Sequence, residues 1–401
     1  MAASHQEIHW RRHCSAGPRS LGFFVLLFLF LTACSTSPIA PDPTAGFAPL
    51  QTPAGPVTVN QVAGIAPTPD LLALDDEMRE FVARYTAGVK SDRQRLKMLH
   101  GALIGAGSHD LQYDPFADGT AQEAFHRGSA NCLSYASLFI ALAREADLDA
   151  SYQWLEIKPE WSLIGERVAV RLHVNTRIDL GRHAQYMVDL DPVASRDVAN
   201  TDRLSDQDGL ALYHNNLAMD ALSQEELTAA WAHSVQAIRL SPEMPHLWVN
   251  LGAIYRASGQ HREAEASYRQ ALELDHTDRS AMNNLAVLYG LEGREGDRDY
   301  WLDQVERYRQ ANPYFHAWQG DIAGKAGDWR EALRHYEKAL RLLPEDSHLL
   351  YAKGNIHYEL NELEEASRLL KEAIDNAPRM SDREAYQVRL EAVRQEALAG
   401  I

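Results

Sequence analysis

The chain has 401 residues, enough for two or three domains, and 45% of them are hydrophobic, as expected for a protein that buries a core. Its formal net charge of −17 argues against nucleic acid or an anionic lipid surface as the main partner. The sequence has neither the paired Cys or His spacing of a zinc site nor a Gly-rich phosphate loop. It therefore predicts no metal and no cofactor.

Residues 1–33 have the order of an export signal, with three arginines before the apolar run 21–31. That run is too short for a comfortable membrane span. It ends in Leu-Thr-Ala-Cys at residues 31–34, which resembles the bacterial lipobox. The resemblance implies cleavage before Cys34, lipidation of that residue and, because Ser35 follows it, sorting to the outer membrane. The alternatives are an ordinary cleaved signal or an uncleaved anchor.

A lipidated Cys34 would tether the protein to the bacterial cell envelope, facing the periplasm, without spanning the membrane. Cys14 would leave with the signal, so Cys132 would be the only free thiol in an oxidising compartment. Residues 34–69 are rich in Pro, Ala and Thr and carry hardly any charge. This composition predicts an extended, weakly ordered tether.

The segment 70–195 is predicted to fold as one domain. Apolar periodicity predicts amphipathic helices near 71–82 and 93–103. Thr120 and Glu123 have the spacing of a capping box and open a short third helix. The histidines at positions 100, 109 and 183 are isolated from any cysteine or carboxylate cluster in the sequence.

Cys132 is predicted to lie at the N-terminus of a buried helix, because apolar residues recur at intervals of three and four from Leu133 to Ala143. The free amides and the positive end of the helix dipole would favour a thiolate there. The alternative role is that of a small buried apolar residue, which is commoner for cysteine.

Period-two alternation then predicts strands at 151–157, 168–175 and 184–191. His173 lies on the polar face of the second strand, and Asp189 and Asp191 share a face of the third. Such an imidazole can take the proton of a thiol, while a carboxylate fixes its tautomer. A strand histidine by itself is equally often a solvated or hydrogen-bonded side chain. Alternation does not distinguish Asp189 from Asp191.

Over residues 70–195, the order and spacing of Cys132, His173 and Asp189 resemble the transglutaminase-like superfamily, whose core is papain-like. The resemblance implies an α+β core in which a helix bearing the cysteine packs against an antiparallel sheet. It also implies that Cys132 is the nucleophile, His173 the general base and acid, and Asp189 rather than Asp191 the orienting carboxylate.

The sequence departs from the family around the site. Leu133 and Val174-Asn175 stand where many members have aromatic residues, so the family's aromatic surroundings are not reproduced. The backbone amide of Cys132 is the first candidate for an oxyanion donor, and Asn131 is a second candidate.

After a polar connection predicted at 196–210, residues 211–380 repeat with a period of 34, which is typical of tetratricopeptide (TPR) helix pairs. Small residues recur where the two helices of each unit would cross closely. Five repeats are predicted, forming an all-α solenoid, with 381–401 as the closing helix. The third repeat has Arg298 and Leu302 where small and aromatic residues are usual, so its second helix is expected to be displaced or exposed.

The sixth position of the first three repeats is asparagine: Asn216, Asn250 and Asn284. Side-chain amides there could bind the backbone of a protein or peptide ligand in a concave groove. Alternatively, they are ordinary structural residues of the repeat.

The sequence thus predicts an envelope-anchored cysteine enzyme, a protease, amidase or acyltransferase, that acts on peptide or protein amides through a thioester. Hydrolysis is the expected outcome in bulk water. The alternative is a non-catalytic TPR scaffold for envelope assembly that retains the cysteine domain only as a fold. The two combine if the repeats recruit the substrate.

Overall fold

The fold is taken from a computed structural model that describes residues 42–105, 108–157, 160–161, 168–169, 172–181, 185–190, 198–377 and 380–399. The expected signal at 1–33, Cys34 and Asp191 lie outside these residues and stay predictions. Within the described ranges, no helix combines the length and the apolar character that a membrane span requires.

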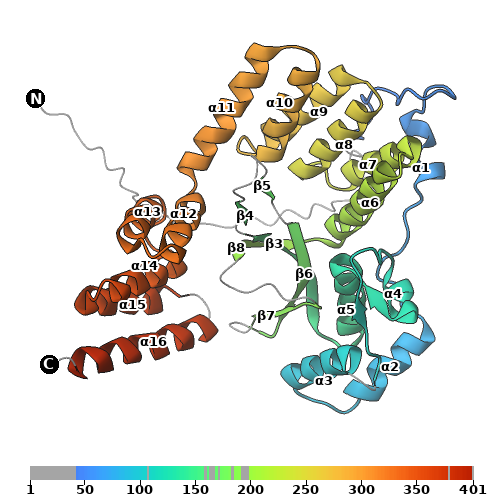
Figure 1. Ribbon diagram of the computed structural model, residues 1–401. Helices are drawn as coiled ribbons and strands as arrows, with labels where there is room; N and C mark the ends of the chain where they lie inside the picture. Colours follow the sequence, from blue (N-terminus) through green and yellow to red (C-terminus); the bar gives the residue numbers. More distant parts are fainter. Residues whose placement is uncertain are drawn as a thin grey trace, which may run out of the picture. The chain divides into compact units, whose positions relative to one another are not determined.

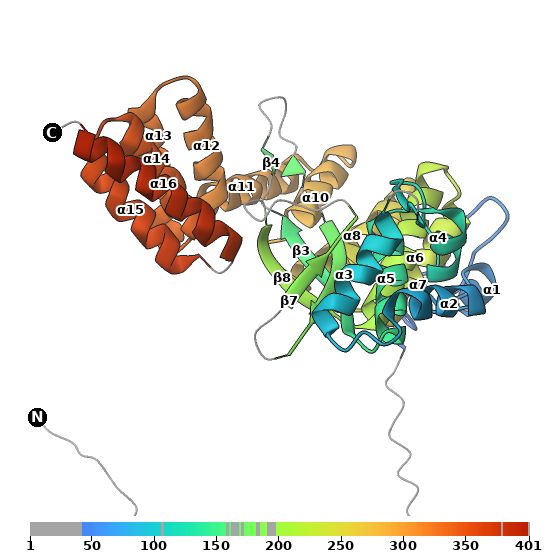
Figure 2. The ribbon, with the colours of Figure 1, turned by 90° about the horizontal axis from the view of Figure 1, so that it is seen from below.

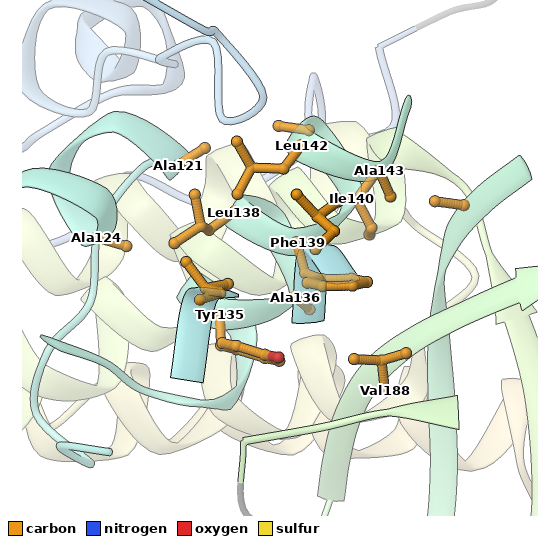
Figure 3. Close-up of a cluster of buried hydrophobic side chains, with 14 of the residues drawn as sticks. Ala121, Ala124, Tyr135, Ala136, Leu138, Phe139, Ile140, Leu142, Ala143 and Val188 are labelled. Atoms are coloured by element: carbon orange, nitrogen blue, oxygen red, sulfur yellow. The ribbon is translucent and has the colours of Figure 1, made fainter. Parts of the chain in front are cut away.

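The cysteine domain is built around one buried helix. Its helices among the described residues are α2 (Asp76–Thr86), α3 (Asp92–Ile104), α4 (Ala121–Arg127) and α5 (Cys132–Glu145). Every side chain of α5 from Leu133 to Ala143 is buried. Figure 3 shows Tyr135, Leu138 and Phe139 in this core, to which Val188 also contributes.

The expected helices are present, with one shifted start. The helix expected at 71–82 begins at Asp76, because the Asp75 side chain accepts a hydrogen bond from the Met78 amide and caps it. The capping box of α4 is formed, with Thr120 and Glu123 each bonding to the other's backbone amide.

An antiparallel sheet covers one side of α5. The helix packs against strands β3 and β6 of this sheet (Figure 1). The strand order is β7-β6-β3-β8, formed by β3 (Asp149–Ile157), β6 (Leu172–Asp179), β7 (Gln185–Val188) and β8 (Val198–Leu204). The described residues also form two short strand pairs: β1 (Gln112–Tyr113) with β2 (Ser129–Ala130), and β4 (Glu160–Trp161) with β5 (Val168–Ala169).

The prediction of a polar connection at 196–210 is wrong. Its central part is β8, which pairs with β3, and its end belongs to the first helix of the solenoid. An edge strand exposes much of its surface to water and can be polar throughout, so the composition of Val198–Leu204 resembled a loop. A capping box between Ser205 and Asp208 then starts α6 five residues before Ala211.

Helix pairs follow at the predicted spacing. They are α6 (Asp206–Ser223) with α7 (Leu227–Leu240), α8 (Pro245–Ala257) with α9 (His261–Leu274), α10 (Arg279–Leu291) with α11 (Glu295–Ala311), α12 (Pro313–Lys325) with α13 (Trp329–Leu342), and α14 (Ser347–Glu359) with α15 (Leu363–Asn376). The closing helix is α16 (Met380–Ala399). It lies beside α15, which in turn lies beside α14 (Figures 1 and 2).

The small residues mark close helix crossings, as predicted. A Cβ atom added to Gly252 would lie 2.5 Å from the ring of Tyr268, and one added to Gly320 would lie 2.6 Å from the ring of Tyr336. Both distances are far shorter than van der Waals contact. The helices of these pairs can therefore approach only because the glycines have no side chain.

The second helix of the third repeat is exposed, as predicted, and the solenoid core is interrupted there. Val305 is the one buried side chain of α11, while Tyr300 and Leu302 are 56% and 38% exposed. Among the described residues, one apolar cluster reaches from the N-terminal segment to Tyr289, and a separate cluster starts in the fourth repeat at Ala332.

Residues 42–69, called the strap here, are ordered against the first two repeats, so the expected weakly ordered tether is wrong for this segment. The strap contains a 3-10 helix η1 (Val59–Gln61) and a short helix α1 (Val62–Ile65). Its Leu50 and Val62 are fully buried in the solenoid core. The Tyr255 hydroxyl donates to the Ala48 carbonyl at 2.7 Å, and Arg239 donates to the Asp42 carboxylate at 3.1 Å.

The first repeat also packs against the cysteine domain. Leu212 of α6 belongs to the same apolar cluster as α5. Gly209 of α6 lies so close to Tyr152 of β3 that a Cβ atom there would be 2.4 Å from the ring. Solenoid and cysteine domain therefore share one core at α6.

Candidate active site

The start of α5 is held by a network of polar contacts. Asn131 is the N-cap: its Oδ1 accepts from the Ser134 amide at 2.9 Å, and its Nδ2 donates to Asp118 Oδ1 at 2.7 Å. Arg127 donates to the Ala117 carbonyl at 2.8 Å and to that of Asp118 at 3.1 Å, which fixes the preceding loop. Cys132 is thereby placed in the first turn of α5.

Asn131 caps the cysteine helix, which is a structural role in addition to the oxyanion role predicted for it. Both ends of its side chain are used in the cap, and the residue is only 4% exposed. The backbone amide of Cys132 is therefore the stronger oxyanion candidate.

Cys132 carries a free, half-buried thiol. Burial raises its pKa above the ordinary value for cysteine, and the Asp189 charge acts in the same direction. Hydrogen bonds from the amides of Val174, Leu133 and Cys132 lower the pKa but do not offset burial. The helix terminus was expected to favour the thiolate; in the structure, desolvation outweighs that effect.

His173 and Asp189 form a close pair, with 2.5 Å between Nε2 and Oδ2. Both side chains are largely buried, at 13% and 6% exposed. The β6–β7 hairpin explains why the two side chains meet. The paired part of β6 extends from Asp179 to Thr176, which lies opposite Val188 of β7. Asp189 is the residue directly after Val188. Since Nε2 donates to the carboxylate, Nδ1 is left as the basic nitrogen of the imidazole.

Strand β6 brings the thiol and the imidazole to one place. The amide that bonds to the Cys132 thiol belongs to Val174, the residue next to His173. The three predicted residues Cys132, His173 and Asp189 therefore converge at this end of the hairpin. Among the described residues, no cluster of His, Cys, Asp or Glu could hold a metal ion.

The solenoid asparagines are used in three different ways. Asn216 Nδ2 donates to Asp118 Oδ1 at 3.0 Å, so this residue contacts the loop before the cysteine helix. Asn250 donates to Asn215 of the neighbouring repeat at 2.7 Å, and Asn284 donates to the Ser280 carbonyl of its own helix. Asn216 therefore connects the repeats to the site.

His100 is a site residue that the sequence analysis missed. One of its ring nitrogens donates to the backbone carbonyl of Asp189. It lines a cavity of about 330 Å³ with Arg93 and Lys97 of the same helix and with Asn175 and Asp189 of the hairpin. The spacing of residues 93, 97 and 100 places them on one face of α3, and that basic helical face was the available signal.

Residues 79–179 match the model of the transglutaminase-like superfamily, and residues 246–278 and 319–381 match two models of the tetratricopeptide repeat. The chain therefore contains a transglutaminase-like domain and TPR repeats. The first match includes Cys132 and His173 and ends before Asp189. The repeat matches leave out residues 279–318, where the third repeat has its exposed second helix.

Among curated proteins, the chain is similar to Photosystem I assembly protein Ycf3 of Cyanophora paradoxa, with 25% identity over 131 residues. The match covers 32% of this chain and 64% of that protein, which is less than two thirds of its length.

Solved structures similar to the chain include the MamA protein, with 16% identity, a TM-score of 0.23 and coverage of 41% of this chain and 91% of that one. Pseudomonas aeruginosa PilF gives 16% identity, a TM-score of 0.25 and coverage of 48% and 88%. YrrB, a TPR protein with an unusual peptide-binding site, gives 19% identity, a TM-score of 0.23 and coverage of 44% and 91%. These values are too low to transfer a function to this chain.

Proposed function

We propose that the protein is a cysteine acyltransferase that acts on peptide or protein amides and ordinarily hydrolyses them. The observation that carries this proposal is the buried His173–Asp189 pair beside the strand amide that bonds to the Cys132 thiol. This arrangement supplies a nucleophile, a base and an orienting carboxylate, which is the set that thioester chemistry requires.

In the first half of the reaction, His173 Nδ1 takes the thiol proton while the Cys132 sulfur attacks the amide carbonyl carbon. The Asp189 carboxylate stabilises the resulting imidazolium. The C–N bond then breaks, the imidazolium gives its proton to the leaving amine, and the acyl group remains on sulfur as a thioester.

In the second half, His173 takes a proton from water, whose oxygen attacks the thioester. The C–S bond breaks, the acid is released and the proton returns to sulfur. An amine in place of water would give acyl transfer. Because burial and Asp189 raise the pKa of the resting thiol, the thiolate depends on proton transfer to His173 rather than on the helix terminus.

The location and partners belong to the same proposal. The lipobox-like segment supports attachment to the outer membrane through Cys34. The TPR repeats support binding of a protein or peptide, which is either the substrate or a partner. Fatty-acid labelling that persists after Cys34→Ser would refute the anchor.

The first experiment is the pH dependence of Cys132 alkylation in the full chain, located by mass spectrometry. His173→Ala should slow alkylation at neutral pH by about tenfold or more, because the proton acceptor is lost. Asp189→Asn makes a sharper test, since the two views of the site predict opposite effects.

If the thiol acts alone, removing the Asp189 charge should lower its pKa and speed alkylation. If thiol and imidazole act as a pair, Asp189→Asn should slow alkylation, because the imidazolium loses its partner. Faster labelling of Asp189→Asn, or indifference to both changes, would favour the scaffold alternative.

A further inference from the structure

The cavity beside Asp189 has a floor of unsatisfied hydrogen-bond acceptors. Asn175 is 2% exposed, and its Oδ1 has no hydrogen-bond partner among the residues that the structure describes. His100 donates one ring N–H to the Asp189 carbonyl, and its buried Nε2 is unpaired within the described part of the chain. Leaving a buried polar atom unpaired is unfavourable, so two such atoms lining one cavity indicate a place for a ligand.

These two unpaired atoms favour a ligand that carries N–H donors. Burial lowers the pKa of His100, so its ring is neutral at pH 7 and Nε2 accepts hydrogen bonds. The Asn175 oxygen is likewise an acceptor. Both atoms would be satisfied by peptide or amide N–H groups.

The mouth of the cavity carries positive charge. Arg93 and Lys97 are exposed, lie one turn apart on α3 and line the same cavity. Neither has an ion-pair partner among the residues that the structure describes, and the Arg93 guanidinium lies 5.8 Å from the ring centre of Tyr186. In a chain of net charge −17, two cations that have no ion-pair partner among the described residues favour an anionic group at the mouth.

We propose that the cavity is a specificity subsite for a carboxylate-bearing residue of the peptide substrate. The carboxylate binds at Arg93 and Lys97, and peptide N–H groups donate to Asn175 Oδ1 and His100 Nε2. The volume of about 330 Å³ lies at the lower end of ligand pockets and fits one residue rather than a long segment. The inference rests on the proposed thiol chemistry, because the cavity is lined by Asp189, one member of the proposed triad.

The test compares two alkylating probes of similar size, anionic iodoacetate and neutral iodoacetamide, on Cys132 of the full chain. In the double variant Arg93→Gln/Lys97→Gln, the ratio of the iodoacetate rate to the iodoacetamide rate should fall roughly fivefold. Arg84→Gln/Lys90→Gln removes the same charge from exposed positions that do not line the cavity. It should leave the ratio nearly unchanged.

The results of this test distinguish a failure of the proposed subsite from a failure of the proposed thiol chemistry. If iodoacetamide labels Cys132 with the pH and His173 dependence described above, but both double variants give the same ratio, the subsite is overturned and the thiol chemistry stands. If iodoacetamide does not label Cys132, the proposed function fails and the subsite fails with it.

A second measurement tests ligand binding directly. N-acetylglutamate methylamide should protect Cys132 from iodoacetamide at a concentration several-fold lower than N-acetylglutamine methylamide. Arg93→Gln/Lys97→Gln should abolish this difference, because only the side-chain carboxylate distinguishes the probes. Equal protection by both probes in the unaltered protein would overturn the proposal.

Discussion

His214 of α6 and His233 of α7 face one another, with 2.9 Å between their Nδ1 atoms. His214 is fully buried, and its Nε2 lies 3.1 Å from the hydroxyl of Thr68 in the strap. Gln236 donates to the same hydroxyl at 2.9 Å. This polar cluster helps hold the strap on the first repeat. Protonation of either histidine would disturb its hydrogen bonds.

Acid should therefore destabilise the first repeat. Burial, with a further contribution from His233, lowers the pKa of His214 to about 4, whereas an unfolded histidine takes a proton near 6.5. The unfolded state binds the extra proton between these values, so stability is full above about pH 6.5 and falls towards pH 4. The expected loss is about 1 kcal/mol at pH 5.5.

Thermal unfolding at pH 7.5 and pH 5.5 measures this effect. His214→Gln should reduce the difference between the two pH values, while the exposed His276→Gln should preserve it. An unchanged difference in His214→Gln would show that other groups account for the acid sensitivity.

The residues of the candidate site could be predicted from the sequence, but the direction of the shift in the thiol pKa could not. Helix periodicity and strand alternation, which are local properties of the sequence, placed Cys132 at a helix start and His173 and Asp189 on strand faces, and the family resemblance selected Asp189 over Asp191. The direction of the thiol pKa was missed, since it depends on burial and on a carboxylate more than fifty residues away. His100 was missed for the same reason, because its contact with Asp189 exists only in the folded chain.

At the scale of elements, the glycines at the helix crossings give a direct test of repeat packing. Gly252→Ala should destabilise the protein by roughly 1–3 kcal/mol, because the new Cβ would overlap the Tyr268 ring. Gly296→Ala in α11 is the matched control. No atom of the described residues lies within 4 Å of a Cβ added at this position, so the variant should gain up to about 1 kcal/mol from helix propensity.

Chemical denaturation of the two variants provides the measurement. If Gly252→Ala were as stable as Gly296→Ala, the helices of the second repeat would not be in the close contact described here. Gly354→Ala should be intermediate, since its Cβ would meet the movable Leu370 side chain at 3.1 Å.

The repeats were predictable as elements because each helix pair packs mainly against its sequence neighbours. The first helices of the second to fifth repeats begin at the predicted residues. The strap and β8 were not predictable, because their partners lie far along the chain: Ala48 bonds to Tyr255, and β8 pairs with β3. Composition alone made both segments resemble loops.

At the scale of the whole molecule, the break in the apolar core at the third repeat predicts two unfolding units. Tyr268 and Tyr336 occupy equivalent positions in the second and fourth repeats and belong to different clusters. Each replacement by alanine should cost about 3–5 kcal/mol within its own cluster. Tyr336→Ala should therefore lower the transition of the last repeats and leave the other transition in place.

Hydrogen exchange along the chain can distinguish the units. Tyr268→Ala should increase exchange in the first two repeats, and Tyr336→Ala in the last two. A single transition that both variants shift equally would contradict the division.

Asp118 accepts a hydrogen bond from the cap of the cysteine helix and another from Asn216 of the first repeat. A ligand that repositions α6 would therefore alter the hydrogen bonding at the first turn of α5, where the thiol lies. Such a coupling is reciprocal: if partner binding at the solenoid changes the affinity of the site for its acyl donor, the acyl donor changes partner affinity by the same factor. This carboxylate gives the two halves of the protein a physical route for allosteric communication.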